Sequence, residues 1–138
     1  IEKLRALRMK LVTAAVVIEK GKVLLTRRKS GERLEGFWEF PGGKIENDET
    51  LHECLEREIK EELGIKSTVK EILYESIYRY EHGEFKIIAI STKLHSNNFD
   101  LKSHDKVHWV QIEELLEYKL LPADIPIAKK IMELNHAI

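Results

Sequence analysis

The segment from Thr50 to Gly64 constrains the fold most, because it carries the start, the buried face and the end of one helix. Thr50 and Glu53 form a Thr-x-x-Glu capping box, in which hydroxyl and carboxylate satisfy free amides of the first helical turn. An apolar side chain recurs every four residues along the segment: Leu51, Leu55, Ile59 and Leu63. Gly64 stands where helices commonly end in a left-handed residue. The pattern predicts an amphipathic helix that ends near Leu63.

Three glutamates of this helix, Glu58, Glu61 and Glu62, share one face when the chain is wound at about 100° per residue. Glu62 falls almost between two core leucines, a costly place for a carboxylate without a partner. One interpretation is a solvated face with ion pairs between successive turns. The other is a hard divalent cation, which takes carboxylate oxygens and removes the repulsion among them. Cys54 lies beside the glutamates and is expected to be a small buried side chain.

The rest of the chain predicts a mixed α/β fold, with strands in the middle and helices packed on either side. We expect a hairpin of residues 11–18 and 23–27, a short strand at 37–40 stopped by 41–43, strands at 67–80, 85–94 and 107–112, a short helix at 112–119 and a final helix at 126–134. With 138 residues the chain is expected to be one domain, residues 1–138, with residues 1–8 as a candidate N-terminal extension.

Composition excludes several classes of partner. The 23 basic and 24 acidic residues nearly cancel, so neither a nucleic-acid surface nor a membrane surface is expected. A DNA-binding repair glycosylase subunit would need a basic surface that this balance does not provide. The single cysteine excludes an intramolecular disulfide, and no apolar run reaches the ~18 residues of a membrane span. These features predict a cytoplasmic protein.

The residues around the helix fit a longer pattern, G-x(5)-E-x(7)-R-E-U-x-E-E-x-G-U with U aliphatic, from Gly43 through Glu49 and Arg57 to Ile65. This pattern is the Nudix box, and the chain resembles the Nudix family over nearly its whole length. Within the family it resembles the MutT-like nucleoside triphosphate pyrophosphohydrolases, through the strings LTRR at 25–28, WEFPGGKIE at 38–46 and LPADIP at 121–126. The string LLPADIPI also resembles the branch that cleaves CTP and modified deoxycytidine triphosphates, with some activity on oxidised dGTP.

The resemblance implies the Nudix fold, in which central mixed β-sheets are sandwiched between α-helices, and a Mg²⁺ or Mn²⁺ cofactor. Its ligands would be the carboxylates of Glu58, Glu61 and Glu62 and the backbone carbonyl of Gly42. Arg57 would hold a glutamate in place, and Glu49 would orient the loop. The family's further metal-binding Glu corresponds to Ser103 here. His104 or Asp105 could substitute, so the general base stays open.

The implied substrate-binding residues are Arg28, Phe40, Gly42, Gly43, Lys44, Tyr78 and Asp124. Strand alternation places at most one of Arg27 and Arg28 in the site, and the family match favours Arg28. Tyr78 is a candidate for base stacking or for the core. Asp124 has two compatible interpretations. An ionised carboxylate accepts from the cytosine amino group, and the same side chain could cap the last helix.

The expected function is metal-dependent hydrolysis of a (deoxy)nucleoside triphosphate to the monophosphate and pyrophosphate. Sanitising of oxidised or modified nucleotides is one role that fits. The alternatives are a Nudix hydrolase for nucleotide sugars or dinucleoside polyphosphates, and a non-catalytic nucleotide-binding Nudix module. The segment 64–120 lacks the Pro characteristic of the ADP-ribose branch, and a pure binding module would not need intact glutamates. The partner is a small nucleotide, and the protein is expected to be a monomer or homodimer.

Overall fold

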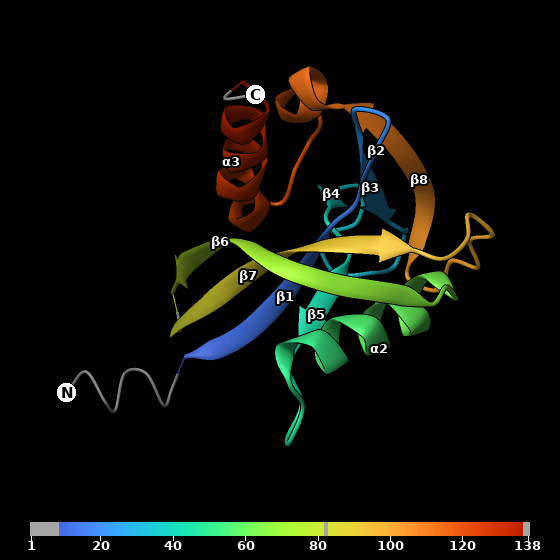
Figure 1. Ribbon diagram of the computed structural model, residues 1–138. Helices are drawn as coiled ribbons and strands as arrows, with labels where there is room; N and C mark the ends of the chain where they lie inside the picture. The colour runs from blue at the N-terminus through green and yellow to red at the C-terminus, as the bar shows by residue number, and fades with distance from the viewer. Residues whose placement is uncertain (1–8, 82, 137–138) are drawn as a thin grey trace.

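The computed structural model describes residues 9–81 and 83–136, so the candidate N-terminal extension lies outside the described residues. Figure 1 shows strands in the middle of the molecule with a helix on either side, as the mixed α/β prediction requires. In chain order the elements are β1 (Lys10–Val16), β2 (Ile18–Glu19), β3 (Lys22–Arg28), β4 (Trp38–Glu39), β5 (Gly42–Lys44), α2 (Leu51–Leu63), β6 (Ser67–Tyr80), β7 (Gly83–Leu94), β8 (His104–Gln111), two 3₁₀ helices (Ile112–Glu117 and Pro122–Asp124) and α3 (Ile125–His136).

The strands form two sheets. One has the order β5-β1-β7-β6, with β1 and β7 parallel, and the other joins β2, β3 and β4, with β8 paired to β3. The expected hairpin of residues 11–18 and 23–27 is wrong for most of its first strand, which does not pair with residues 23–27. β1 pairs with β5 and β7 in the first sheet, whereas Ile18–Glu19 pair with β3 in the second. The reason is that β1 is apolar on both faces, which favours the middle of a sheet covered on both sides.

Two hydrophobic cores lie on opposite faces of β1 and β7. Ala14 and Val16 face one core together with Ile127, Ala128 and Ile131 of α3. Ala15 and Val17 face the other together with Leu55, Ile59 and Leu63 of α2. Alternation along one buried strand thus explains why the two helices cover opposite faces of the sheet (Figure 1). Among the described residues, no helix is long and apolar enough to cross a membrane.

The strand at residues 38–39 ends before Pro41, as predicted, but Gly42–Lys44 form a further strand that the sequence did not lead us to expect, β5, which pairs antiparallel with β1 in the other sheet. In this register Gly42 faces Ala14 and Gly43 faces Thr13. The approach is close enough that a Cβ atom on Gly42 would lie 2.0 Å from the Thr13 carbonyl oxygen. The glycines therefore let the loop before α2 join the sheet instead of leaving it.

We expect Gly42→Ala to destabilise the protein by about 3 kcal/mol or more, because the added methyl group meets backbone atoms that cannot rotate away. Gly31→Ala is the control, since Gly31 has a φ of +90° but nothing within 4 Å of its Cβ position. That variant should show only the left-handed backbone cost, about 1 kcal/mol. Urea unfolding followed by circular dichroism measures both values. Equal losses would mean that the β5–β1 contact contributes nothing specific.

Candidate active site

Helix α2 has the predicted caps and the predicted buried face. The Thr50 hydroxyl accepts from the Glu53 amide at 3.1 Å, the Glu53 carboxylate accepts from the Thr50 amide at 2.9 Å, and Gly64 ends the helix with a φ of 71°. Leu55 and Ile59 are completely buried against the first sheet. Burial on that side fixes the rotation of the helix and turns its glutamates toward β5.

Arg57 forms hydrogen bonds with several acidic side chains beside β5. Its Nε donates to Glu49 at 2.6 Å, and its Nη1 donates to Glu58 at 2.7 Å and to Glu61 at 3.1 Å. Its Nη2 donates to the Lys44 carbonyl at 3.1 Å, which ties the helix to β5. The hydrogen bond with Glu49 is the largest cause that raises the pKa of Arg57, and the same bond lowers the pKa of Glu49. One guanidinium therefore positions three carboxylates.

Gly43 makes room for one of these carboxylates. A Cβ atom at Gly43 would lie 2.3 Å from the Glu58 carboxyl carbon, so Glu58 rests directly on β5. Burial is the largest cause that raises the pKa of Glu58, against the lowering effect of Arg57. Glu61 is different, with a side chain 58% exposed. The two glutamates thus offer one carboxylate against the sheet and one toward solvent.

Glu62 points inward, with 14% of its side chain exposed, and its Oε1 accepts from the Gly42 amide at 3.1 Å. Burial raises the pKa of Glu62 to about 9, and the negative charges of Glu39 and Glu58 add to the effect. The Gly42 amide and the positive charge of Arg28 lower the pKa of Glu62 but do not offset these effects. The role of the Gly42 carbonyl as a ligand stays a prediction.

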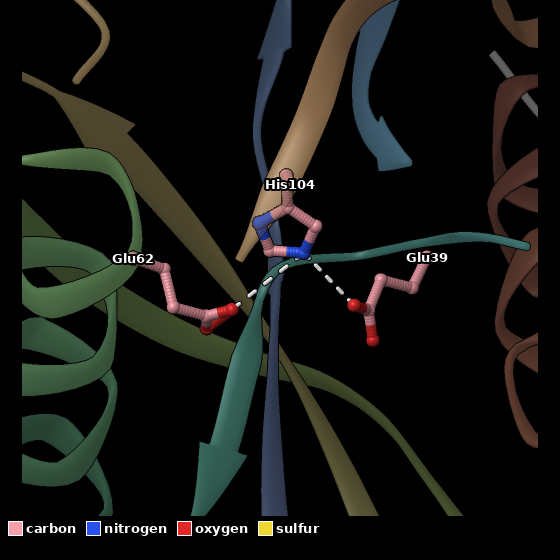
Figure 2. A group of neighbouring side chains, drawn as sticks. All are labelled: Glu39, Glu62 and His104. Carbon is pink, nitrogen blue, oxygen red and sulfur yellow. Dashed lines mark hydrogen bonds and ion pairs between the residues drawn. The ribbon is translucent and has the colours of Figure 1, made fainter. Parts of the chain in front are cut away.

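Glu39 and His104 are site residues that the sequence reasoning missed or left open. Figure 2 shows the His104 ring between Glu39 and Glu62, with Nε2 at 2.9 Å from Glu39 Oε2 and 3.7 Å from Glu62 Oε2. Arg28 Nη1 donates to the same Glu39 oxygen at 2.9 Å. The available signal was strand alternation, because Glu39 stands between the core side chains Trp38 and Phe40 and must face the other way.

Ser103 and Asp105 flank His104 in the sequence and have other described partners. Asp105 is paired with Arg27 at 2.8 Å, and its role in place of the family's further metal-binding Glu stays a prediction. The carbonyl of Ser103 accepts from the Lys29 amide at 3.1 Å. The expected alternation of Arg27 and Arg28 is confirmed in the structure, since Arg28 turns toward Glu39 and Arg27 toward Asp105.

Asp124 is buried, and its Oδ2 accepts from the Phe40 amide at 3.1 Å. Its described hydrogen bond therefore crosses to the end of β4 instead of capping α3, and the capping interpretation is not supported. Burial raises the pKa of Asp124 to about 8, with Glu39 as a second cause. This places a buried carboxyl with a raised pKa close enough to Glu39 to feel its charge.

The remaining residues that were expected to bind the substrate lie at separate places in the fold. The Phe40 side chain belongs to the core, Lys44 is exposed on β5, and Tyr78 on β6 packs against Phe85 with ring centroids 5.4 Å apart. Their substrate contacts stay predictions. Cys54 is fully buried, as expected, and burial raises the pKa of its thiol.

In this arrangement, the glycine-containing strand β5 precedes α2, and the clustered carboxylates of α2 lie beside the buried imidazole of His104. These shared features define a class of protein. Residues 9–133 match the family described as NUDIX domain. The chain belongs to the Nudix family and is a Nudix hydrolase.

Two relatives and one solved structure show which members of the family the chain is similar to. The chain is 36% identical over 126 residues to the CTP pyrophosphohydrolase of Escherichia coli K12, covering 91% of this chain and 93% of the relative. It is 43% identical over 58 residues to an 8-oxo-dGTP diphosphatase of Proteus vulgaris, covering 41% and 52% of the two chains. The solution structure of the E. coli ORF135 protein superposes with a TM-score of 0.82 at 35% identity, over 94% and 93% of the two chains.

The burial of Glu62 predicts a pH-dependent effect of Glu62→Gln on the metal-free protein. A pKa raised from 4.5 to about 9 on folding means that the wild type loses stability as pH rises through this range. Gln has no proton to lose, so the melting temperature of Glu62→Gln in EDTA should match the wild type near pH 5 and exceed it increasingly toward pH 9.

Glu56→Gln, at an exposed position of the same helix, is the control and should show no such trend. If Glu62→Gln melted below the wild type at pH 9, the ionised carboxylate would instead be a stabilising partner of His104.

Proposed function

We propose that this protein hydrolyses a nucleoside triphosphate to the nucleoside monophosphate and pyrophosphate, with a cytosine nucleotide or an oxidised guanine nucleotide as substrate. The observation that carries the proposal is the similarity to a CTP pyrophosphohydrolase over 91% of the chain, with Glu58, Glu61 and Glu62 all in place. The partial match to an 8-oxo-dGTP diphosphatase supports the second substrate. We further infer action in the cytoplasm as a monomer or homodimer, without a nucleic-acid partner.

We propose Mg²⁺, or Mn²⁺, as the cofactor, held by the glutamates of α2 and the Gly42 carbonyl. The donor set fits, because the buried Glu62 carboxyl lies near Glu39 and Glu58 and gains from a positive charge. When bound, such a cation neutralises the polyphosphate and lowers the pKa of a water molecule. The chain's own contribution is positioning. Arg57 orients Glu58 and Glu61, and Glu49 holds Arg57.

The substrate would be read at the end of β4. Arg28 lies beside Glu39 and offers a positive charge to a phosphate or a hydrogen-bond donor to a base. Asp124 offers an acceptor when ionised and a donor when protonated. A Nudix hydrolase of nucleotide sugars or dinucleoside polyphosphates would use the same glutamates. Release of pyrophosphate across a nucleotide panel therefore separates the two functions.

Losing one metal-ligand carboxylate should lower kcat by about 10³-fold or more, because several kcal/mol of transition-state stabilisation are lost. Glu61→Gln and Glu62→Gln test this with CTP and 8-oxo-dGTP, and phosphate analysis after pyrophosphatase treatment measures turnover. Glu56→Gln, on the same helix, should keep wild-type turnover. Near-full activity of Glu61→Gln and Glu62→Gln would contradict the ligand assignment.

The base preference should depend on pH through Asp124. With a pKa of about 8, this carboxyl is ionised above pH 8 and accepts from the cytosine amino group. Below pH 8 it carries a proton and can donate to the carbonyl of an oxidised guanine. The ratio of kcat/KM for CTP to that for 8-oxo-dGTP should therefore be higher at pH 9 than at pH 6.5.

Asp124→Asn supplies a donor at every pH, so it should favour 8-oxo-dGTP and remove the pH dependence of the ratio. One base-edge contact is worth about 1–3 kcal/mol of discrimination. Asn keeps an acceptor for the Phe40 amide, so the fold should be retained. Identical ratios in the wild type and Asp124→Asn at both pH values would place base selection elsewhere.

A further inference from the structure

Side chains from three strands of the second sheet meet at one oxygen atom of Glu39. Glu39 lies on β4, which pairs with β3, and β3 also pairs with β8. Arg28 of β3 donates from Nη1 to Glu39 Oε2 at 2.9 Å, and His104 of β8 places Nε2 at 2.9 Å from the same oxygen. Figure 2 shows the His104 ring with this nitrogen turned toward the carboxylate. Glu39 is therefore contacted from two other strands at once.

A bulge in the pairing of β3 with β8 brings His104 to this oxygen. Arg27 lies opposite Lys106 of β8. The next residue, Arg28, lies opposite His104, so Asp105 is the extra residue of the bulge. Asp105 pairs with Arg27 at 2.8 Å, whereas the His104 side chain turns inward and is only 1% exposed. Bulges beside active sites commonly redirect a side chain in this way.

The partners of the two ring nitrogens decide where His104 carries its proton. Nδ1 is buried and has no hydrogen-bond partner in the described part of the chain. A proton on Nδ1 would be buried without an acceptor, which is costly, whereas a proton on Nε2 meets a carboxylate oxygen. His104 is thus a hydrogen-bond donor at Nε2, and this nitrogen has no lone pair to offer to a metal ion.

Distances decide which carboxylate receives the hydrogen bond. Glu62 Oε2 is 3.7 Å from His104 Nε2, beyond hydrogen-bond length, whereas Glu39 Oε2 is at 2.9 Å. Glu62 accepts instead from the Gly42 amide at 3.1 Å. His104 therefore acts on Glu39, at the end of β4, and not on the glutamates of α2.

We propose that His104 is a positioning residue, which donates from Nε2 to Glu39 and thereby holds Glu39 and Arg28 in the arrangement that binds the nucleotide. The Arg28 guanidinium is anchored at Nε by the Arg33 carbonyl and at Nη1 by both oxygens of Glu39. Losing the His104 hydrogen bond removes one of the donors that fix a carboxylate only 12% exposed. The inference rests on the proposed function, in which Arg28 binds the substrate.

Nuclear magnetic resonance tests the hydrogen bond in EDTA and without nucleotide. The ¹⁵N chemical shifts of the His104 ring should place its proton on Nε2 and none on Nδ1. Glu39→Gln replaces a charged acceptor by a neutral one, so the Nε2–H proton resonance should move upfield. Glu62→Gln is the matched control at the other carboxylate and should move it far less. A proton on Nδ1, or a larger response to Glu62→Gln than to Glu39→Gln, would overturn the proposal.

Kinetics distinguish positioning from a merely structural role. The amide nitrogen of Gln reaches about as far from the backbone as His Nε2, whereas that of Asn reaches only about as far as Nδ1. With the better substrate of CTP and 8-oxo-dGTP, His104→Gln should keep KM within about threefold of the wild type. His104→Asn should raise KM about 10-fold and lower kcat less than about threefold, because a binding interaction is lost.

His108→Asn is the control for the kinetics, because His108 lies on the same strand but is exposed and contacts Tyr118. It should leave KM and kcat unchanged. An unchanged KM in His104→Asn, or a folded His104→Gln that is impaired as much as His104→Asn, would contradict the positioning role. If His104→Asn does not fold, His104→Gln and the ring spectra decide.

The proposed function and this inference fail in different ways. If the wild type hydrolyses no nucleoside triphosphate, the function fails, and the ring spectra still decide whether His104 donates to Glu39. If hydrolysis proceeds while the ring proton lies on Nδ1, the inference fails and the function stands. Wild-type turnover and the metal-free spectra therefore give separate answers.

Discussion

Burial of one face of α2 against β1 and β7 is the constraint on which the rest of the site depends. Leu55, Ile59 and Leu63 are fully buried in that interface, so the helix cannot rotate about its axis. Fixed rotation holds Glu58 and Glu62 in a largely buried position, with 17% and 14% of their side chains exposed, although burial is unfavourable for a charged carboxylate. The hydrophobic energy of one face thus holds carboxylates in place on the next, which is how a site can be prepared before any ligand arrives.

The segment from Trp38 to Gly43 serves both sheets. Trp38 and Phe40 enter the core while Glu39 faces the site, and two residues later Gly42 pairs with β1 in the other sheet. Ala15 donates to the Pro41 carbonyl at 2.7 Å, so the crossing itself is tied to β1. Only Phe40 and Pro41 separate Glu39 on one sheet from Gly42 on the other, so the two positions are held at a short, fixed separation.

The sequence alone predicts the parts of the molecule governed by local chemistry. Residue type and spacing predict the caps of α2, its buried stripe, the strand ranges of β6 and β7, and the opposite directions of Arg27 and Arg28. The pairing of β1 with β7 could not be read in this way, since parallel partners far apart in sequence leave no turn between them. The same limit hid Glu39 and His104, which meet only because β3 pairs with both β4 and β8.

The charges and the burial around the site explain why its acidic groups differ so much in pKa. Glu49 faces Arg57 and has a lowered pKa, whereas Glu62 and Asp124 are buried beside Glu39 and have pKa values raised to about 9 and about 8. Burial is the largest cause of both raised pKa values, and Glu39, which pairs with Arg28 at 2.9 Å, is the second cause of each. Glu62 and Asp124 are therefore electrostatically coupled to the same carboxylate, and a change of charge near Glu39 would shift the pKa of both neighbours at once.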